Sequence, residues 1–308
     1  KKPHLAYKFN IYATAPLSRA YVYVDANTGE IVHQNSIIHH VAETGSADTR
    51  YSGTRTITAD SYNGSYRLRD ASRGNGVETY DCNTGTSYNN AVDFTDNDNN
   101  WTSGEHNNAQ KDNAALDAHW GAQMTFDYWN QMHGRNSYDD NGAVIKSYVH
   151  YNSNYDNAFW NGSVMTYGDG SSFDALTALD VVGHEIGHAV CEKTANLVYS
   201  YESGAMNEGF SDIWGAAIEH FAKGNGNDFA PSFEVWQIGD ELAASPLRSM
   251  SNPNSQGQPD TYLGDSWYAG SGDNGGVHYN SGVLNHWFYR LVIGGSGTND
   301  NGTAFNVS

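Results

Sequence analysis

The chain of 308 residues is long enough to form two domains, each with its own core, and its 13% aromatic content is typical of a packed globular protein. It carries 16 basic and 35 acidic residues, and its net charge of -19 repels phosphate backbones and anionic lipid surfaces. We therefore expect neither nucleic acid nor a membrane as a partner. Carboxylates in such excess also suit a protein that binds calcium.

Short segments near the start of the chain alternate polar and apolar side chains, which predicts a small β-meander. These segments are 5–12, 20–25 and 30–34, with a turn at 27–29. The alternation is lost over 39–48, which predicts a linker. His39 and His40 are neighbours in this segment, and adjacent side chains of an extended chain point to opposite faces. We expect them to be a solvated pair and not a metal site.

Strand patterns recur between residues 51 and 80, and a long polar connection follows at 83–108. Residues 109–132 then place apolar side chains every three or four positions, which predicts an amphipathic helix. His119 lies on the apolar stripe of this helix, and no second metal-binding side chain accompanies it. We therefore expect a core histidine.

The second half of the chain shows strand patterns and then helix patterns. The strands are predicted at 144–150 and 157–167, the helices at 175–193, 204–222 and 280–293, and a polar connection at 223–279. The segment 157–160 is either an ordinary edge strand or a strand that binds a peptide substrate through its main chain. A connection as long as 223–279 is more often functional than idle.

The two cysteines, Cys82 and Cys191, are too few to form a disulfide scaffold. Two alternatives stay open for them: buried thiols, which we favour, and a Cys82–Cys191 bridge. Cys191 lies three residues after His188, and this offset turns it to one side of the helix face that carries that histidine. We do not expect it to bind a metal.

A metal site is predicted on the helix at 175–193. His184 and His188 are four residues apart, so a helix stacks both imidazoles on one face, and Glu185 lies beside them. A catalytic zinc takes three protein ligands and leaves a fourth position to water, and Glu208 on the next helix is the natural third ligand. Asp212, one turn further, is placed to accept the free N–H of a ligand histidine.

These residues suit hydrolysis. Zinc makes its bound water acidic enough to supply hydroxide near neutral pH, and Glu185 can take that proton as general base and return it to a leaving group. Amide hydrolysis also needs donors for an oxyanion. Tyr199, Arg248 and His278 are polar residues at positions that nothing else explains, and they are the candidates.

The segment 180–212, with its His-Glu-Ile-Gly-His and Asn-Glu-Gly-Phe-Ser-Asp motifs, resembles the thermolysin-like secreted metalloproteases, and more narrowly those of the vibriolysin type. Further segments resemble the same family over most of residues 50–293. They are 157–160, similar to its substrate-binding edge strand, 167–170, similar to the following turn, 247–250, similar to a specificity loop, and 273–282, similar to its oxyanion-side histidine segment.

The resemblance implies roles for individual residues. It implies zinc on His184, His188 and Glu208, Glu185 as base and proton shuttle, Tyr199 and His278 as oxyanion donors, and Asp212 as the residue that orients a zinc histidine. It also implies that Asn157, Ala158 and Arg248 hold the substrate main chain, and that Phe173, Leu176, Val181 and Leu247 line a pocket for a bulky apolar residue just after the scissile bond. Calcium is implied on Asp180, Glu219 and Asp228, although Ala216 stands where some members have a carboxylate.

The resemblance further implies an α+β fold of two domains. We expect a β-rich N-terminal domain with the zinc helix over 47–195 and a mainly helical, incomplete C-terminal domain over 196–308. Residues 1–46 resemble the end of the inhibitory propeptide, with 21–30 as its closing hairpin, and we expect cleavage between Gly45 and Thr49.

The expected protein is a secreted, monomeric zinc endopeptidase with Zn²⁺ and Ca²⁺. It acts on proteins or peptides, and its own propeptide serves as intramolecular inhibitor and chaperone. The alternative is a metal-containing binding or propeptide-inhibited assembly without turnover. The intact Glu185 favours the enzyme.

Overall fold

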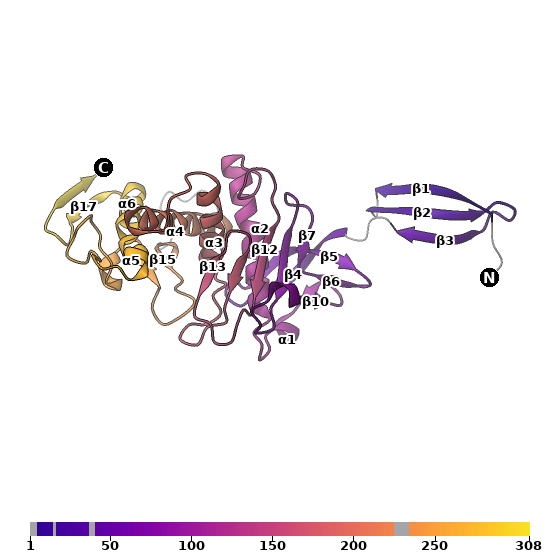
Figure 1. Ribbon diagram of the computed structural model, residues 1–308, viewed down its shortest axis with the longest axis horizontal. Coiled ribbons are helices and arrows are strands. Elements are labelled where there is room, and N and C mark those ends of the chain that lie inside the picture. Colours follow the sequence, from indigo (N-terminus) through magenta and orange to yellow (C-terminus); the bar gives the residue numbers. More distant parts are fainter. Residues whose placement is uncertain (1–4, 15–16, 37–40, 225–233) are drawn as a thin grey trace.

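The computed structural model describes residues 5–14, 17–36, 41–224 and 234–308. Along its longest axis the molecule has a small N-terminal sheet at one end, a β-rich part in the middle and helices toward the C-terminal end (Figure 1). The histidine pair His39 and His40 and the calcium candidate Asp228 lie outside the described residues.

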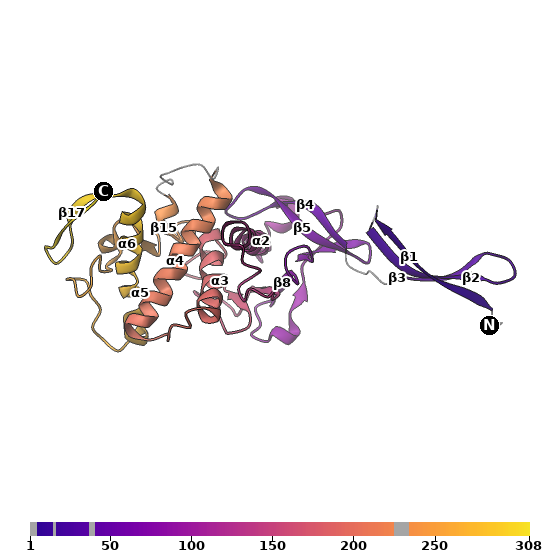
Figure 2. The same cartoon turned by 90° about the horizontal axis from the view of Figure 1, so that it is seen from above.

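The N-terminal sheet is the predicted meander, and it is confirmed. Strands β1 (Ala6–Thr14), β2 (Leu17–Asp25) and β3 (Ile31–Ser36) are antiparallel neighbours in that order. The Asp25 carboxylate accepts the backbone N–H groups of Asn27 and Thr28, which holds the turn between β2 and β3. Both views place this sheet at the end of the molecule that is remote from the helices (Figure 1 and Figure 2).

The predicted linker is instead largely a strand, β4 (Val41–Asp48). It pairs along its whole length with β5 (Thr54–Tyr62), and its Ser46–Ala47 stretch also pairs with β11 (Asn100–Trp101). Ala47 is fully buried. The linker prediction is wrong here because main-chain hydrogen bonds to two neighbours can hold a strand that lacks apolar alternation.

Two further sheets form the β-rich part. One has the order β10-β6-β5-β4-β11, and the other has the order β13-β14-β12-β8-β7 with β9 paired to β8. The remaining bounds are β6 (Ser65–Arg67), β7 (Arg69–Asp70), β8 (Val77–Asp81), β9 (Val92–Asp93), β10 (Thr95–Asp96), β12 (Ile145–Val149), β13 (Ala158–Trp160) and β14 (Met165–Tyr167). Within the described chain β13 is an edge strand, so its main chain is open to a partner on one side.

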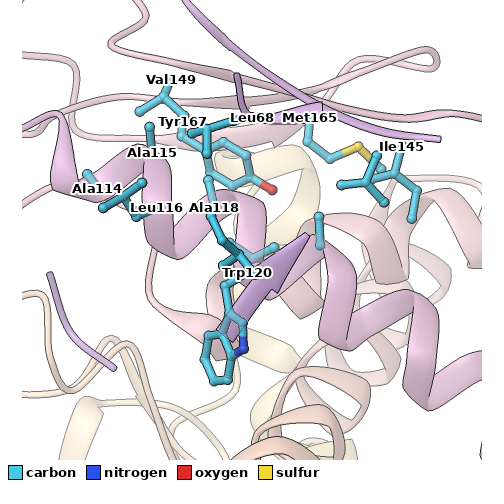
Figure 3. Packing of buried hydrophobic residues seen from close by; sticks show 14 of the residues in the cluster. Leu68, Ala114, Ala115, Leu116, Ala118, Trp120, Ile145, Val149, Met165 and Tyr167 are labelled. Carbon is cyan, nitrogen blue, oxygen red and sulfur yellow. The ribbon is translucent and has the colours of Figure 1, made fainter. Parts of the chain in front are cut away.

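Helix α2 (Asn113–His133) packs against β8 and β12 and fills the space between the sheets and the later helices. Its alanines allow close packing on larger side chains of the strands, among them Ile145, Val149 and Met165 (Figure 3). The resulting core is continuous with α3 (Leu179–Lys193). This core therefore fixes α3 against the sheets.

His119 is a core residue, as predicted. Its side chain is fully buried on α2, with Nδ1 3.0 Å from Thr79 Oγ1 and Nε2 2.9 Å from the Thr58 carbonyl oxygen. Burial lowers the pKa of His119 to about 4, which keeps the ring neutral. Cys82 and Cys191 are both buried and free, so the thiol alternative is confirmed and the bridge is wrong.

Helices α3 and α4 (Tyr201–Lys223) pack closely because glycines lie between them. A Cβ added to Gly183 would lie 3.1 Å from the Gly215 Cα, and one added to Gly187 would lie 3.1 Å from the Ser211 Cα. Side chains on the facing surfaces of the two helices are therefore brought within reach of one another. Figure 2 shows α3 and α4 side by side.

Helices α5 (Asp273–Asn280) and α6 (Gly282–Ile293) pack on α4. Among the described residues, no helix is long enough and apolar enough to cross a bilayer. The remaining elements are α1 (Ser103–His106), the 3-10 helices η1 (Tyr88–Asn90), η2 (Glu234–Trp236) and η3 (Pro253–Gln256), and the strands β15 (Gln237–Ile238), β16 (Arg248–Ser249), β17 (Gly295–Thr298) and β18 (Ala304–Val307).

Candidate metal centre and cleft

The three predicted zinc ligands come together between α3 and α4. His184 Nε2 lies 3.4 Å from Glu208 Oε2, and His188 Nε2 lies 3.3 Å from Glu208 Oε1. One ligand atom from each of the three residues falls within 4.8 Å of the others. Glu208 is fully buried, and its Oε2 has no hydrogen-bond partner among the described residues. Two imidazoles and a buried carboxylate with an orphaned oxygen fit a zinc ion.

A side-chain oxygen near the Nδ1 atom orients each of the two histidines. His184 Nδ1 lies 2.8 Å from Asp212 Oδ1, and His188 Nδ1 lies 2.7 Å from Asn207 Oδ1. These contacts leave each Nε2 as the nitrogen that faces the third ligand, Glu208. The sequence reasoning missed Asn207, although its place directly before Glu208 on the same helix was an available signal.

Besides His184, two side chains hold the Asp212 carboxylate. Arg248 donates to it through Nε and Nη2, both at 2.6 Å, and Asn285 Nδ2 on α6 donates at 2.7 Å. Burial opposes the charge, but Arg248 and His184 together hold the pKa of Asp212 below its usual value. Arg248, predicted to bind the substrate main chain, therefore also anchors the group that orients His184.

Glu185 lies next to the two histidines in the cavity and is 5% exposed. Its Oε2 has no hydrogen-bond partner in the described part of the chain. Burial raises the pKa of Glu185, and the charge of the neighbouring histidines only partly offsets this. A carboxylate with a raised pKa is a better proton acceptor than an ordinary glutamate near neutral pH.

Tyr199 and His278 are far apart in sequence but lie next to each other beside Glu208. The Tyr199 hydroxyl donates to Glu208 Oε1 and lies 3.2 Å from His278 Nε2. Asp273 orients the histidine, because its Oδ1 is 2.6 Å from His278 Nδ1 and its Oδ2 accepts the His278 backbone N–H at 2.9 Å. Asp273 was not predicted, since it lies five positions before His278 and the non-helical backbone at 274–276 brings the two together.

A cavity of about 1110 Å³ opens over these groups. Strand β13 borders it, and α3 and α5 contribute further walls. All residues that were predicted to bind substrate line it: Asn157, Ala158, Phe173, Leu176, Val181, Leu247 and Arg248. Leu176 and Val181 belong to a buried apolar cluster, which suits a pocket for an apolar side chain.

A second charged cluster spans the same two helices. Asp180 and Glu219 are buried there, and two half-buried carboxylates that were not predicted, Asp240 and Glu241, lie beside them. Lys223 Nζ bonds Glu219 Oε1 at 2.7 Å and Glu241 Oε1 at 2.8 Å. The other oxygens of Glu219 and Glu241 have no hydrogen-bond partner among the residues described. Burial and the neighbouring carboxylates raise the pKa of Asp180 to about 7.

Comparison with known proteins agrees with this architecture. The sequence profile of the thermolysin metallopeptidase catalytic domain matches residues 44–192, and that of the thermolysin metallopeptidase alpha-helical domain matches residues 195–307. A bacillolysin from Brevibacillus brevis is 41% identical over 302 residues, which cover 95% of this chain and 52% of the relative. A thermolysin from Alicyclobacillus acidocaldarius is 39% identical, over 95% of this chain and 55% of the relative.

Among solved structures, the precursor of protealysin, a metalloproteinase from Serratia proteamaculans, superposes with a TM-score of 0.58 at 32% identity. The match covers 70% of this chain and 68% of that chain. A ligand set of two histidines and a glutamate beside a β-rich half and a helical half is the architecture of a two-domain metallopeptidase. The chain belongs to the thermolysin family of metallopeptidases, so the predicted family and α+β fold are confirmed. It spans about half the length of the curated relatives it matches.

Proposed function

We propose that the protein is a zinc endopeptidase that cuts internal peptide bonds. The observation that carries this proposal is the convergence of His184, His188 and Glu208 beside the buried Glu185, which faces the same cavity and whose Oε2 has no hydrogen-bond partner among the described residues. When bound, zinc would acidify a water molecule and polarise the scissile carbonyl. The chain's own residues would supply the other parts of the reaction.

Glu185 is positioned to act as base and proton shuttle. Its carboxylate takes a proton from the attacking water and delivers it to the leaving nitrogen, so that the proton is conserved through the cycle. Tyr199 and His278 donate hydrogen bonds to the oxyanion of the tetrahedral species. Asp212 holds the ring of His184, and Asp273 holds the ring of His278.

Strand β13 and Arg248 would bind the substrate. The open edge of β13 pairs with an extended peptide, and Asn157 and Ala158 lie at its start, beside the cavity. Arg248 Nη1 is free of the two bonds to Asp212 and can donate to a substrate carbonyl. Phe173, Leu176, Val181 and Leu247 would select a bulky apolar residue just after the scissile bond.

Replacement of the base tests the mechanism. Glu185→Gln keeps the size of the side chain but removes its basicity, so cleavage of casein and of a blocked dipeptide is expected to fall by at least about 10²-fold. A zinc chelator is expected to abolish activity of the wild type. Full activity of Glu185→Gln, or cleavage that resists the chelator, would contradict the proposal. An intact, metal-loaded wild type without turnover would favour the non-catalytic assembly.

We also propose one structural calcium ion in the acidic cluster. Four carboxylates gather there and Lys223 bonds two of them, while two buried carboxylate oxygens have no hydrogen-bond partner among the described residues, which suits a hard cation. Asp180 and Glu219 remain the predicted ligands, and Asp240 and Glu241 join them. Calcium binding to the protein, measured by calorimetry, tests this, and no uptake by the zinc-loaded protein would refute it.

We further propose the division 1–46, 47–195 and 196–308, with a secreted, monomeric enzyme of the vibriolysin type and a propeptide remnant at the start. The separate sheet of β1–β3 and the likeness to a protease precursor support the first segment. The expected cut between Gly45 and Thr49 falls at the end of β4, which is paired to β5, so β4 must separate locally before cleavage. Mass spectrometry of incubated active enzyme tests this, and a chain that stays uncut would count against it.

A further inference from the structure

Six aromatic side chains form a continuous surface beside the cleft, which we call the aromatic face. They are Tyr80, Tyr88, Tyr148, Tyr151, Tyr155 and Phe159, and each is partly exposed. Their position follows from strand alternation. On β12, Ile145, Ser147 and Val149 are buried toward the core, so Tyr148 between them points outward. Tyr80 on β8 follows the buried Thr79 and points the same way.

The rings touch in sequence across the sheet. Tyr80 stacks on Tyr148 with centroids 5.1 Å apart, and Tyr148 meets Tyr88 at 4.7 Å. Tyr88 then stacks on Tyr151 at 5.9 Å, and Tyr151 meets Phe159 edge-on at 5.6 Å. Tyr155 closes the row with centroids 5.5 Å from Tyr151 and 6.2 Å from Phe159. The row therefore runs without a gap from β8 to β13.

The aromatic face is held rigidly in its middle. The Tyr88 hydroxyl lies 2.8 Å from Thr166 Oγ1 on β14 and accepts a hydrogen bond from Asn161 Nδ2 at 3.2 Å. At the far end, Tyr80 donates to Glu78 Oε2 at 2.6 Å. Fixed aromatic rings offer contact area to a ligand at little cost in conformational entropy.

The charges near the aromatic face pair with one another. Lys146 lies 3.7 Å from Glu78, and Arg69 is paired with Asp93 at 2.7 Å and also lies over the Tyr80 ring. These two pairs neutralise the charged side chains next to Tyr80. That part of the surface therefore suits a neutral ligand better than an acidic or a basic one.

The aromatic face continues the cleft, because Phe159 lies on β13 and lines the cavity. We propose that it binds a proline-rich, polyproline II segment of the substrate next to the part that pairs with β13. This rests on the proposed peptidase function. Proline has no N–H and cannot extend the pairing with β13, whereas its ring packs on aromatic side chains and the bare carbonyls of polyproline II accept bonds from tyrosine hydroxyls.

Binding to an inactive protein tests the inference without turnover. Zinc-loaded Glu185→Gln is titrated with a neutral proline-rich decapeptide, and heat or tyrosine fluorescence is followed. Tyr88→Leu with Tyr151→Leu keeps apolar bulk but removes two rings from the middle of the row, and is expected to weaken binding roughly 10-fold. Tyr66→Leu, a half-buried tyrosine of the other sheet, serves as the matched control and is expected to leave binding unchanged.

Turnover gives an independent readout. In the active protein the double variant is expected to lower kcat/KM for gelatin about 10-fold and to leave a blocked dipeptide unaffected, since the dipeptide reaches only the cleft. Tyr151→Leu alone, with its fold checked by circular dichroism, serves if the double variant unfolds. Equal binding by the variant and the wild type would overturn the proposal, as would binding of neutral oligosaccharides in place of the peptide. Loss of all peptidase activity in the wild type would sink the proposed function but leave the binding assay valid.

Discussion

Two buried charged clusters span the contact between α3 and α4, and the chain neutralises them differently. In the metal centre, Asp212 faces His184 and receives three further bonds from Arg248 and Asn285. In the acidic cluster of four carboxylates, Lys223 is the one basic side chain among the described residues that bonds them, and it bonds Glu219 and Glu241. The first cluster therefore positions its ligands with charges of its own, whereas the second keeps excess negative charge that a cation from solution can balance.

Removing Arg248, the basic side chain that pairs with Asp212, is expected to have the largest effect on stability. Arg248→Ala removes the guanidinium that pairs with the buried Asp212 carboxylate, so the free energy of unfolding is expected to fall by about 3–5 kcal/mol. Urea unfolding measures this. Arg69→Ala is the control, because Arg69 also pairs with an aspartate but is 27% exposed, and it is expected to cost about 1 kcal/mol or less. Equal losses of unfolding free energy in the two variants would contradict the greater importance of the buried Arg248–Asp212 pair.

Adding calcium is expected to have a smaller effect, confined to the acidic cluster. Calcium at about 100 times its Kd stabilises a protein that binds it only when folded by about 2.7 kcal/mol. Thermal unfolding of the calcium-free, zinc-loaded protein with increasing calcium measures this. Glu241→Gln is expected to reduce the response and the exposed Glu202→Gln to leave it unchanged. A calcium response that survives in Glu241→Gln would place the ion elsewhere.

Removing the hydrogen bond that orients His188 is expected to weaken zinc binding without unfolding the protein. Asn207→Ala removes the oxygen that holds His188 Nδ1, and such changes usually lower metal affinity about 10–100-fold. Competition with a chromophoric chelator measures the affinity. Asn196→Ala, which changes a cavity residue that is exposed and bonds neither histidine, is the matched control. If Asn196→Ala weakened zinc as much, the orienting role of Asn207 would be wrong.

The zinc site could be predicted from sequence because its spacing is local. His184, Glu185 and His188 occupy one helix, and Glu208 and Asp212 the next, so helical periodicity places each set on one face of its own helix. Asn285 was not predicted because its contact with Asp212 depends on how α6 packs on α4, and Asp273 was not predicted because a kink within α5 brings it to His278. Asp240 and Glu241 were not predicted because the sequence before them shows no periodicity that would place them on a helix or strand.

Strand prediction failed where pairing and not composition decides the structure. The meander at 5–34 shows clear alternation and was predicted, but β4 carries Glu-Thr-Gly-Ser-Ala-Asp, a polar run that is typical of a loop. Its neighbours β5 and β11 are what make it a strand. The aromatic face was not foreseen either, because its six rings come from four separate stretches of the chain.

His150 forms a third charged cluster with two aspartates. Its cation differs from Arg248 and Lys223, because a histidine loses its proton within an accessible pH range. His150 is buried with Nδ1 2.7 Å from Asp169 and Nε2 3.4 Å from Asp112. Burial opposes protonation, but the two carboxylates outweigh it and raise the pKa of His150 to about 9. The folded protein therefore holds this proton more tightly than the unfolded chain, whose histidines titrate near pH ~6.5.

The stability that His150 contributes is fully present below pH ~6.5 and is lost as the pH rises through about 9. Urea unfolding across this window is expected to show a decline that His150→Gln flattens. His133→Gln, an exposed histidine of α2, is expected to keep the wild-type slope. Arg248 and Lys223 stay charged over most of this range, so a slope that persists in His150→Gln would have to arise from other groups, such as Asp180 of the acidic cluster, whose pKa of about 7 lies in the same window.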